Sequence, residues 1–240
     1  MAKVIVIGAG PAGIMAAIHA SKKHNVTILD GNDRIGKKLF ITGKGRCNVT
    51  NAKDISEFFD YIPGNPHFLY SALYSYTNED TMNFFENVGI KLKVERGGRV
   101  FPMSDKSSDI IKGLSIGLKE SNVQVKLNSK VTNIIYDANK IVGVEINNST
   151  KLYGDYFIIA TGGASYPLTG SRGEGQKFAK KLGHTIIELK PSLVPIELNE
   201  PWLKDLMGLS LKNISLSILK NNKVLYKNQG EMLFTNYGIS

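Results

Sequence analysis

The chain has little cysteine and no long apolar run. Cys47 is the single cysteine among 240 residues, so no disulfide can form within the chain, and we expect a reducing, cytoplasmic setting. No apolar stretch reaches the ~20 residues that a membrane-spanning helix needs, so we expect no membrane partner. The first apolar run covers only residues 4–7 and glycines follow it, which is unlike a secretory signal peptide.

Sequence signatures of metal sites and of hydrolytic catalysis are also missing. The four histidines form neither an HxH nor an HExxH pattern, so we expect no metal: His19, His24, His67 and His184. No Ser/His/Asp or paired-carboxylate arrangement stands out, so no catalytic side chain is assigned. That absence is typical of an enzyme whose bound cofactor carries the chemistry.

The net charge of +9 permits contacts with phosphates or RNA. An RNA-binding surface typically gathers its lysines in a stripe with interleaved aromatics, whereas the lysines here are scattered along the chain. The pattern favours a solvated basic surface over a nucleic-acid partner.

Residues 4–17, VIVIGAGPAGIMAA, predict a strand, a glycine turn and a helix. Residues 4–7 are continuously β-branched, as in a buried parallel strand. Residues 12–23 have apolar residues at helical spacing and two lysines at the end, which predicts a helix. In this context the spacing Gly8-x-Gly10-x-x-Gly13 indicates a dinucleotide-binding turn.

Each glycine of the turn has a geometric role. Gly8 permits the tight turn, Gly10 lets the backbone approach a pyrophosphate, and Gly13 lets the helix lie close to the strand. The N–H groups that begin the helix, near Ala12, suit phosphate oxygens.

Asp30 follows a second predicted strand over residues 26–29, about 20 residues after the glycines. A carboxylate there accepts hydrogen bonds from both hydroxyls of an adenosine ribose. It also repels a 2′-phosphate, which argues against NADP at this site. The sequence therefore predicts a Rossmann-type site for an ADP group.

The next stretch, GNDRIGKKLFITGKGRCNVTN (residues 31–51), favours FAD over NAD. Five basic residues and four glycines lie within it, and no acidic residue lies between residues 34 and 46. Such a loop suits a pyrophosphate and the approach to a flavin ring. We refer to residues 34–48 as the basic loop.

Residues 123–163 predict short strands with turns at 137–140 and 147–150. The last strand, residues 156–160, leads into Thr161-Gly162-Gly163. A three-stranded antiparallel excursion that returns to a strand ending in ATGG resembles the second segment of flavoproteins with two dinucleotide-binding domains.

Four further segments resemble one group of flavoproteins: GKGRCNVTN (43–51), GGRVFPMSDKSSDI (97–110), IIATGGASYPLTGSRGEGQKFAKKLGH (158–184) and PSLVPIEL (191–198). They are similar to the aminoacetone-oxidase group of FAD-binding oxidoreductases, also called BaiN-like or YhiN-like. Two places depart from the family pattern. Asp30 stands where the family more often has glutamate, and Arg172 and Glu174 replace threonine and aspartate.

The resemblance implies an α/β fold in two parts. Residues 1–188 are expected to form a Rossmann-type FAD-binding domain, a parallel sheet with helices plus the antiparallel excursion. The family's chains are longer, so we expect this domain to lack its C-terminal return segment. Residues 189–240 read as the start of an inserted, mostly β domain, because their strands have too few partners to close a sheet.

The candidate FAD-binding residues come from the turn, the basic loop and the returning strand: Gly8, Gly10, Ala12, Gly13, Asp30, Gly31, Lys38, Gly43, Gly45, Arg46, Cys47, Asn48, Val131, Thr161 and Gly162. For Arg46 and Asn48, holding the loop together is an equal alternative.

Three further assignments concern packing and the substrate. Cys47 has no second cysteine to pair with, which favours a packing role over a redox role. Arg99 in GGRVFP is a candidate for binding a substrate carboxylate, with a structural arginine as the alternative. Phe68, Leu69, Leu73 and Tyr76 lie at helical spacing, which predicts the core face of a helix within residues 66–85.

The leading functional hypothesis is an FAD-dependent oxidoreductase that moves a hydride between the flavin and a small organic substrate. Both amine oxidation and reduction of a carbon–carbon double bond stay open, as do NAD(P)H and O2 as electron partners. The alternatives are an RNA-associated flavoprotein related to tRNA-modifying enzymes, and a protein that has lost its cofactor and only packs with a partner.

Overall fold

The computed structural model describes residues 1–138, 140–191 and 194–240 and divides into two compact units, residues 1–186 and residues 187–240. Asn139, in the turn predicted at 137–140, lies outside the described residues. So do Ser192 and Leu193 of the PSLVPIEL segment.

Unit 1 is built on a four-stranded parallel sheet in the order β10-β1-β2-β6. Its strands are β1 (Lys3–Ile7), β2 (Asn25–Leu29), β6 (Gln124–Lys126) and β10 (Tyr156–Ile159). Residues 4–7 of the central β1 strand are at most 4% exposed, which confirms the predicted buried strand. Val4 and Val6 pack into one core cluster, whereas Ile5 and Ile7 pack into another, because alternate side chains point to opposite faces of the sheet.

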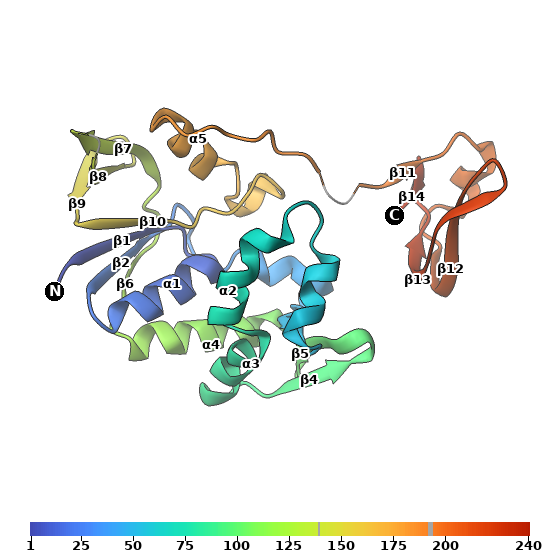
Figure 1. Ribbon diagram of the computed structural model, residues 1–240, viewed down its shortest axis with the longest axis horizontal. Helices are drawn as coiled ribbons and strands as arrows, with labels where there is room; N and C mark the ends of the chain where they lie inside the picture. Colours follow the sequence, from blue (N-terminus) through green and yellow to red (C-terminus); the bar gives the residue numbers. More distant parts are fainter. Residues whose placement is uncertain (139, 192–193) are drawn as a thin grey trace. The chain divides into compact units, whose positions relative to one another are not determined.

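Helices α1 (Pro11–Ser21) and α4 (Ser107–Glu120) cover one face of this sheet (Figure 1). Ile14 and Ala17 of α1 and Ile110 and Leu114 of α4 are buried against the strands there. The predicted first helix is thus confirmed, although it ends at Ser21, two residues earlier than expected.

The other face of the sheet carries the predicted antiparallel excursion. It consists of β7 (Val131–Asp137), β8 (Lys140–Ile146) and β9 (Thr150–Tyr153), ordered β7-β8-β9. Together with Phe178 of α5 (Glu174–Lys181), this sheet buries Ile5 and Ile7 of β1. The Rossmann-type α/β fold is confirmed.

The prediction of a helix core within residues 66–85 is wrong. The segment forms a 3₁₀ turn (Pro66–Leu69), a six-residue helix α2 (Tyr70–Ser75) and a separate helix α3 (Asn78–Asn87). No residue of the first two elements is buried, and Phe68 is 80% exposed. The regular spacing is interrupted because Thr77 and Asp80 form a capping box that starts α3 anew.

The aromatic side chains of this region pack against one another instead. Phe59, in the 3₁₀ segment Ile55–Tyr61, lies with its ring centroid 4.0 Å from that of Tyr70 and 5.8 Å from that of Tyr74. The rings therefore form an outer aromatic cluster on unit 1.

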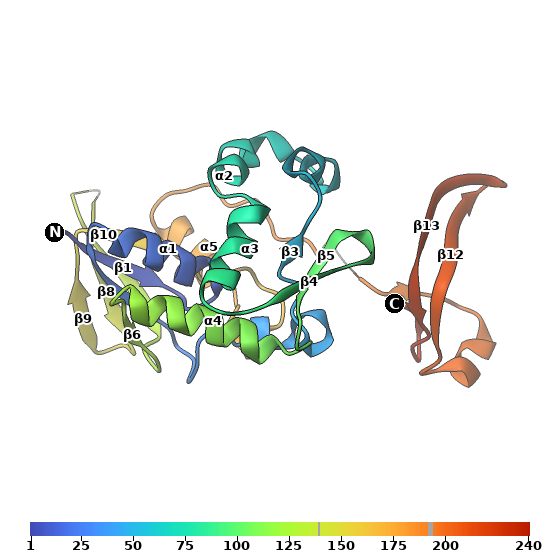
Figure 2. The same cartoon turned by 90° about the horizontal axis from the view of Figure 1, so that it is seen from below.

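A second small antiparallel sheet, ordered β3-β5-β4, lies beside the basic loop. It comprises β3 (Thr50–Asn51), β4 (Leu92–Glu95) and β5 (Arg99–Pro102), and Arg96–Gly98 make the 3₁₀ turn between β4 and β5. Figure 2 shows β4 following α3 and pairing with β5. The basic loop itself contains the 3₁₀ segment Leu39–Gly45.

Unit 2 is a mostly β structure. A long hairpin joins β12 (Ser210–Lys220) to β13 (Lys223–Leu233), and β11 (Ile196–Glu197) pairs with β14 (Gly238–Ile239). Among the described residues, two further 3₁₀ turns are Pro167–Thr169 in unit 1 and Pro201–Leu206 in unit 2. Leu203 and Phe234 are the buried apolar residues of unit 2 among those described. That residues 189–240 begin an inserted domain stays a prediction.

The close approach of α1 to the glycine turn depends on Gly13. A Cβ atom at this position would collide with the carbonyl oxygen of Gly8 and would lie 3.2 Å from the Cβ atom of Ala160. At Gly10, in contrast, a Cβ atom would meet nothing within 4 Å, and its φ of −77° suits any residue.

We expect Gly13→Ala to lower the free energy of unfolding by about 1–3 kcal/mol, because overpacking forces the backbone of the turn to move. Gly10→Ala is the matched control, and we expect a much smaller effect. Chemical denaturation of both variants measures the difference. Equal stability of the two variants would contradict the packing role of Gly13.

Candidate functional site

A cleft of about 540 Å³ opens at the carboxyl ends of β1, β2 and β10. Ligands of open α/β sheets bind at this edge, and the volume is within the range of ligand pockets. The cleft is lined by residues 7–12, 29–32, 36–38, 130–131, 160–162, 168–172, 174 and 178.

The glycine turn and the start of α1 line the cleft with backbone. The N–H of Gly8 donates to the carbonyl of Leu29 at 2.8 Å, which fixes the turn to the end of β2. Gly10 is the N-cap of α1; no side chain caps the helix and no acidic residue lies in its first turn. An uncapped helix start with open space above Gly10 fits a diphosphate, whose negative charge the N–H groups and the helix dipole favour.

Asp30 joins the end of β2 to the glycine turn. Its Oδ2 atom accepts a hydrogen bond from the N–H of Ala9 at 2.6 Å. Its Oδ1 atom accepts from the backbone N–H and the side-chain Nδ2 of Asn32, at 2.8 and 2.9 Å. Each carboxylate oxygen can accept more than one hydrogen bond, so Asp30 can hold the turn and still receive ribose hydroxyls in the cleft.

Asn32 is a cleft residue that the sequence reasoning missed. Its Nδ2 also donates to the carbonyl of Thr169 at 3.2 Å, and its own carbonyl accepts the N–H of Asn128 at 2.9 Å. The side chain therefore ties the Asp30 side of the cleft to a segment more than a hundred residues away. Only its position two residues after Asp30 could have indicated it.

Residues 168–172 and 174 form a wall of the cleft, and none of them is among the candidate FAD-binding residues. Arg172 and Glu174, which depart from the family pattern, form hydrogen bonds within this wall. The N–H of Arg172 donates to Glu174 Oε2 at 3.1 Å, and its Nε donates to the carbonyl of Pro167 at 3.1 Å.

Three lysines give the cleft positive charge: Lys37, Lys38 and Lys130. Lys38 Nζ lies 3.3 Å from Ser165 Oγ, and Lys37 Nζ lies 3.7 Å from Asp33. The hydrogen bond from Arg34 holds the pKa of the Asp33 carboxyl below its usual value. Sequence reasoning named Lys38 but not Lys130.

The structure brings nine of the predicted cofactor-binding residues together in the cleft: Gly8, Gly10, Ala12, Asp30, Gly31, Lys38, Val131, Thr161 and Gly162. Gly13 lies beneath the turn, against Gly8. Six other candidates lie outside the set that lines the cleft: Gly43, Gly45, Arg46, Cys47, Asn48 and the substrate-binding candidate Arg99.

The side chains at the end of the basic loop are engaged with the protein. Arg46 forms ion pairs with Glu95 and Asp105. The amide nitrogen of Asn48, in its favourable orientation, donates to the carbonyls of Thr50 and Val100 at 3.0 and 3.2 Å. These contacts hold the loop, the alternative that the sequence left open.

Cys47 is 1% exposed and packs in the core beneath α1. Burial raises the pKa of its thiol. It lines a smaller, almost wholly apolar cavity of about 140 Å³, which shares Pro11 with the main cleft. This environment favours the packing role over a redox role.

Arg99 is exposed at the start of β5. Its Nε donates to the carbonyl of Arg96 at 3.2 Å, and its guanidinium carbon lies 6.0 Å from the centroid of the Phe101 ring. The exposed guanidinium is compatible with an anionic ligand, and substrate binding stays a prediction.

Within residues 1–138, 140–191 and 194–240, no group of three His, Cys, Asp or Glu side chains is placed to hold a metal ion. No helix in the same part of the chain combines the length and the apolar character needed to cross a membrane.

Comparison with curated proteins finds relatives along the whole chain. The chain is 32% identical over 244 residues to the 3-dehydro-bile acid delta(4,6)-reductase of Clostridium scindens. The matched region covers 100% of the chain and 58% of that protein. The ribosomal RNA dihydrouridine synthases of Escherichia coli and Haemophilus influenzae are 30% and 33% identical over 98% of the chain. The chain spans 58% of the length of each of these relatives.

Solved structures show the same fold. A flavocytochrome c3 fumarate reductase in its open conformation superposes with a TM-score of 0.56 at 20% identity, covering 88% of the chain and 47% of that protein. The Sdh1 complex of Mycobacterium smegmatis gives the same TM-score and identity over 75% of the chain and 38% of that chain.

The family model described as the HI0933-like protein Rossmann domain matches residues 2–236, nearly the entire chain. With the parallel sheet, the glycine turn and the acidic residue after β2 in place, the chain belongs to this HI0933-like family, and FAD is the cofactor of its Rossmann domain.

Proposed function

We propose that the cleft binds the ADP half of FAD. The diphosphate lies at the start of α1, over Gly10 and Ala12, and the adenosine ribose lies at Asp30. The observation that carries this assignment is the uncapped start of α1 facing the same cleft as the Asp30 carboxylate. Lys37, Lys38 and Lys130 add positive charge where a diphosphate would lie.

We assign the isoalloxazine half of FAD to the basic loop and to the end of β10. Gly43 and Gly45 of this loop are exposed, and both have positive φ angles that favour glycine. Thr161 and Gly162 follow β10 and lie in the cleft. The loop is thus the part of the chain assigned to orient the ring.

The reaction we propose is the reduction of a carbon–carbon double bond in a small organic substrate. The names of the curated relatives describe a reductase of a bile acid and synthases of dihydrouridine, and in both reactions a ring double bond gains hydrogen. FAD supplies the hydride for such a reduction when it is bound and reduced. The chain's own contribution is to hold the ADP group and to orient the ring.

A double bond conjugated to a carbonyl group is the best acceptor for this hydride, because the carbonyl takes up the developing negative charge. Arg99 is our candidate for anchoring a carboxylate of such a substrate, since its guanidinium is exposed and forms two parallel hydrogen bonds readily.

Ribosomal RNA is the second candidate substrate. Two relatives are named as ribosomal RNA dihydrouridine synthases, and the net charge of +9 is compatible with a polyanion. The outer aromatic cluster argues in the other direction. Its Phe59 belongs to the segment Ile55–Tyr61, whose charged residues Glu57 and Asp60 are acidic. The segment that packs against the exposed rings of Tyr70 and Tyr74 therefore adds negative charge.

We expect Asp30→Ala to weaken FAD binding by about 1–3 kcal/mol, the cost of losing hydrogen bonds to a charged acceptor. Fluorescence titration with FAD measures the effect, and denaturation reports the loss of the Ala9 contact separately. Asp30→Glu is the matched control, since it keeps the charge, and we expect it to retain most of the affinity. FAD affinity that does not change in Asp30→Ala would remove Asp30 from the site.

A second experiment separates the candidate substrates. The flavin-loaded protein is reduced with dithionite without oxygen and then mixed with a steroid that has a ketone conjugated to a double bond, or with ribosomal RNA. We expect the steroid to restore the absorbance of oxidised flavin. If ribosomal RNA restores this absorbance and the steroid does not, ribosomal RNA is the substrate of the two.

Two further outcomes of that experiment contradict the proposed reduction. If neither acceptor restores the absorbance but an amine reduces the oxidised flavin, the protein acts in the oxidase direction. If the purified protein carries no flavin and takes up none, the chain has lost its cofactor.

A further inference from the structure

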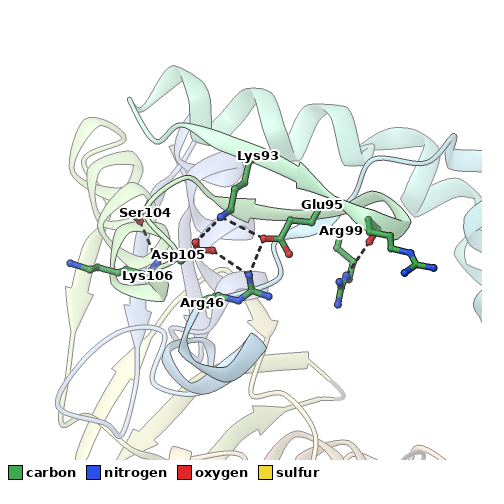
Figure 3. A network of polar contacts seen from close by, with 8 residues as sticks. Arg46, Lys93, Glu95, Arg99, Ser104, Asp105 and Lys106 are labelled. Carbon is green, nitrogen blue, oxygen red and sulfur yellow. Dashed lines mark hydrogen bonds and ion pairs between the residues drawn. The ribbon is translucent and has the colours of Figure 1, made fainter. Parts of the chain in front are cut away.

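Arg46 lies in a network of four charged side chains (Figure 3). Its Nη1 atom lies 2.9 Å from Glu95 Oε1 and 3.3 Å from Asp105 Oδ1. Lys93 completes the network, with its Nζ 2.6 Å from Asp105 Oδ2 and 3.5 Å from Glu95 Oε1. Two positive and two negative charges therefore neutralise one another.

The network joins three segments of the chain. Arg46 ends the 3₁₀ segment Leu39–Gly45 of the basic loop, whereas Lys93 and Glu95 belong to β4. Asp105 lies in the turn between β5 and α4. One guanidinium group thus fastens the basic loop both to the small sheet and to the turn before α4.

Packing supports the same attachment. The guanidinium carbon of Arg46 lies 4.0 Å from the ring centroid of Phe101, which is 3% exposed. A cation over an aromatic face is attracted by the negative charge of the ring face. A Cβ atom at Gly43 would lie 3.3 Å from the same ring, so the loop backbone lies directly on β5.

Hydrogen bonds within the network favour the charged forms of Arg46 and Asp105. The hydrogen bond to Glu95 raises the pKa of Arg46, and the hydrogen bond from Lys93 lowers the pKa of Asp105. Because the carboxylates already engage the guanidinium, Arg46 is poorly placed to neutralise a phosphate as well.

We propose that Arg46 is a positioning residue: by pairing with Glu95 and Asp105 it fixes the basic loop on β5 and so sets where that loop meets the flavin ring. The inference rests on the proposed function in one respect, the assignment of the loop to the ring half of FAD. It replaces direct phosphate binding as the role of Arg46.

Variants that neutralise the two carboxylates (the acid variants) distinguish the two roles, because each role predicts an opposite change in FAD affinity. If Arg46 positions the loop, Arg46→Ala and the double variant Glu95→Gln/Asp105→Asn both weaken FAD binding, by about tenfold, which corresponds to ~1.4 kcal/mol. ADP binding stays unchanged in both, because ADP is assigned to the cleft, which residues 43–48 of the loop do not line. If Arg46 binds phosphate, Arg46→Ala weakens ADP and FAD equally, and the acid variants tighten both by freeing the guanidinium. That second pattern would overturn the proposal.

Arg34→Ala is the matched control. Arg34 is another arginine of the basic loop. Its side chain is 65% exposed and pairs with the adjacent Asp33 and not with β4, so we expect its loss to leave FAD affinity unchanged. Arg46→Lys keeps the charge but not the paired geometry, and we expect an intermediate loss. The absorption spectrum of bound FAD gives a further readout, since a shifted loop changes the surroundings of the ring.

Hydrogen exchange of the protein without cofactor tests the loop itself. We expect the amides of residues 40–49, among them Val49, whose N–H donates to the carbonyl of Val100 at 2.8 Å, to exchange faster in Arg46→Ala and in the acid variant. Unchanged exchange in both would overturn the positioning role even if FAD does not bind. If the loop loosens but neither ADP nor FAD binds the unchanged protein, the proposed function fails and the structural role of Arg46 stands.

Discussion

The contact between Gly13 of α1 and the carbonyl of Gly8 is the constraint on which the site depends. It lets the helix begin immediately above the end of β1, so that the start of α1 and the carboxyl edge of the sheet open into one cleft. Any side chain at residue 13 would push the helix away and separate the two. The buried side chains of α1 and β1 then keep the helix in that position, since Ile14, Val4 and Val6 are at most 3% exposed.

Asp30 extends this constraint to the rest of the cleft. Through Ala9 it holds the glycine turn, and through Asn32 it is linked to Thr169, which also lines the cleft. One carboxylate therefore connects three backbone segments, at Ala9, Asn32 and Thr169, before any ligand is present. Under the proposed assignment to the ribose, a side chain held in this way loses little conformational entropy on binding, which is the physical benefit of preorganisation.

The sequence predicts the parts of the site that depend on local geometry. The strand, the glycine turn, the first helix and Asp30 follow from short-range spacing. Asn32, Lys130 and residues 168–172 could not be found in that way, because the folded sheet alone brings them to the cleft. Helical spacing failed at Phe68 for a related reason: the capping box at Thr77 divides the segment, and pieces of six residues cannot bury a continuous face.

Charge shows most clearly how local sequence and folded structure differ. The basic loop contains no acid between residues 34 and 46, and this pattern suggests that all its cations face phosphate. The fold divides them: Lys37 and Lys38 line the cleft, whereas Arg46 meets carboxylates that come from residues 95 and 105. Arg46 lies 2.9 and 3.3 Å from two carboxylates, whereas Lys37 has one carboxylate at 3.7 Å, so the lysine keeps more of its attraction for an anion. Under the proposed function, the lysines of the cleft therefore attract the diphosphate. Arg46 uses its charge to hold the basic loop in place.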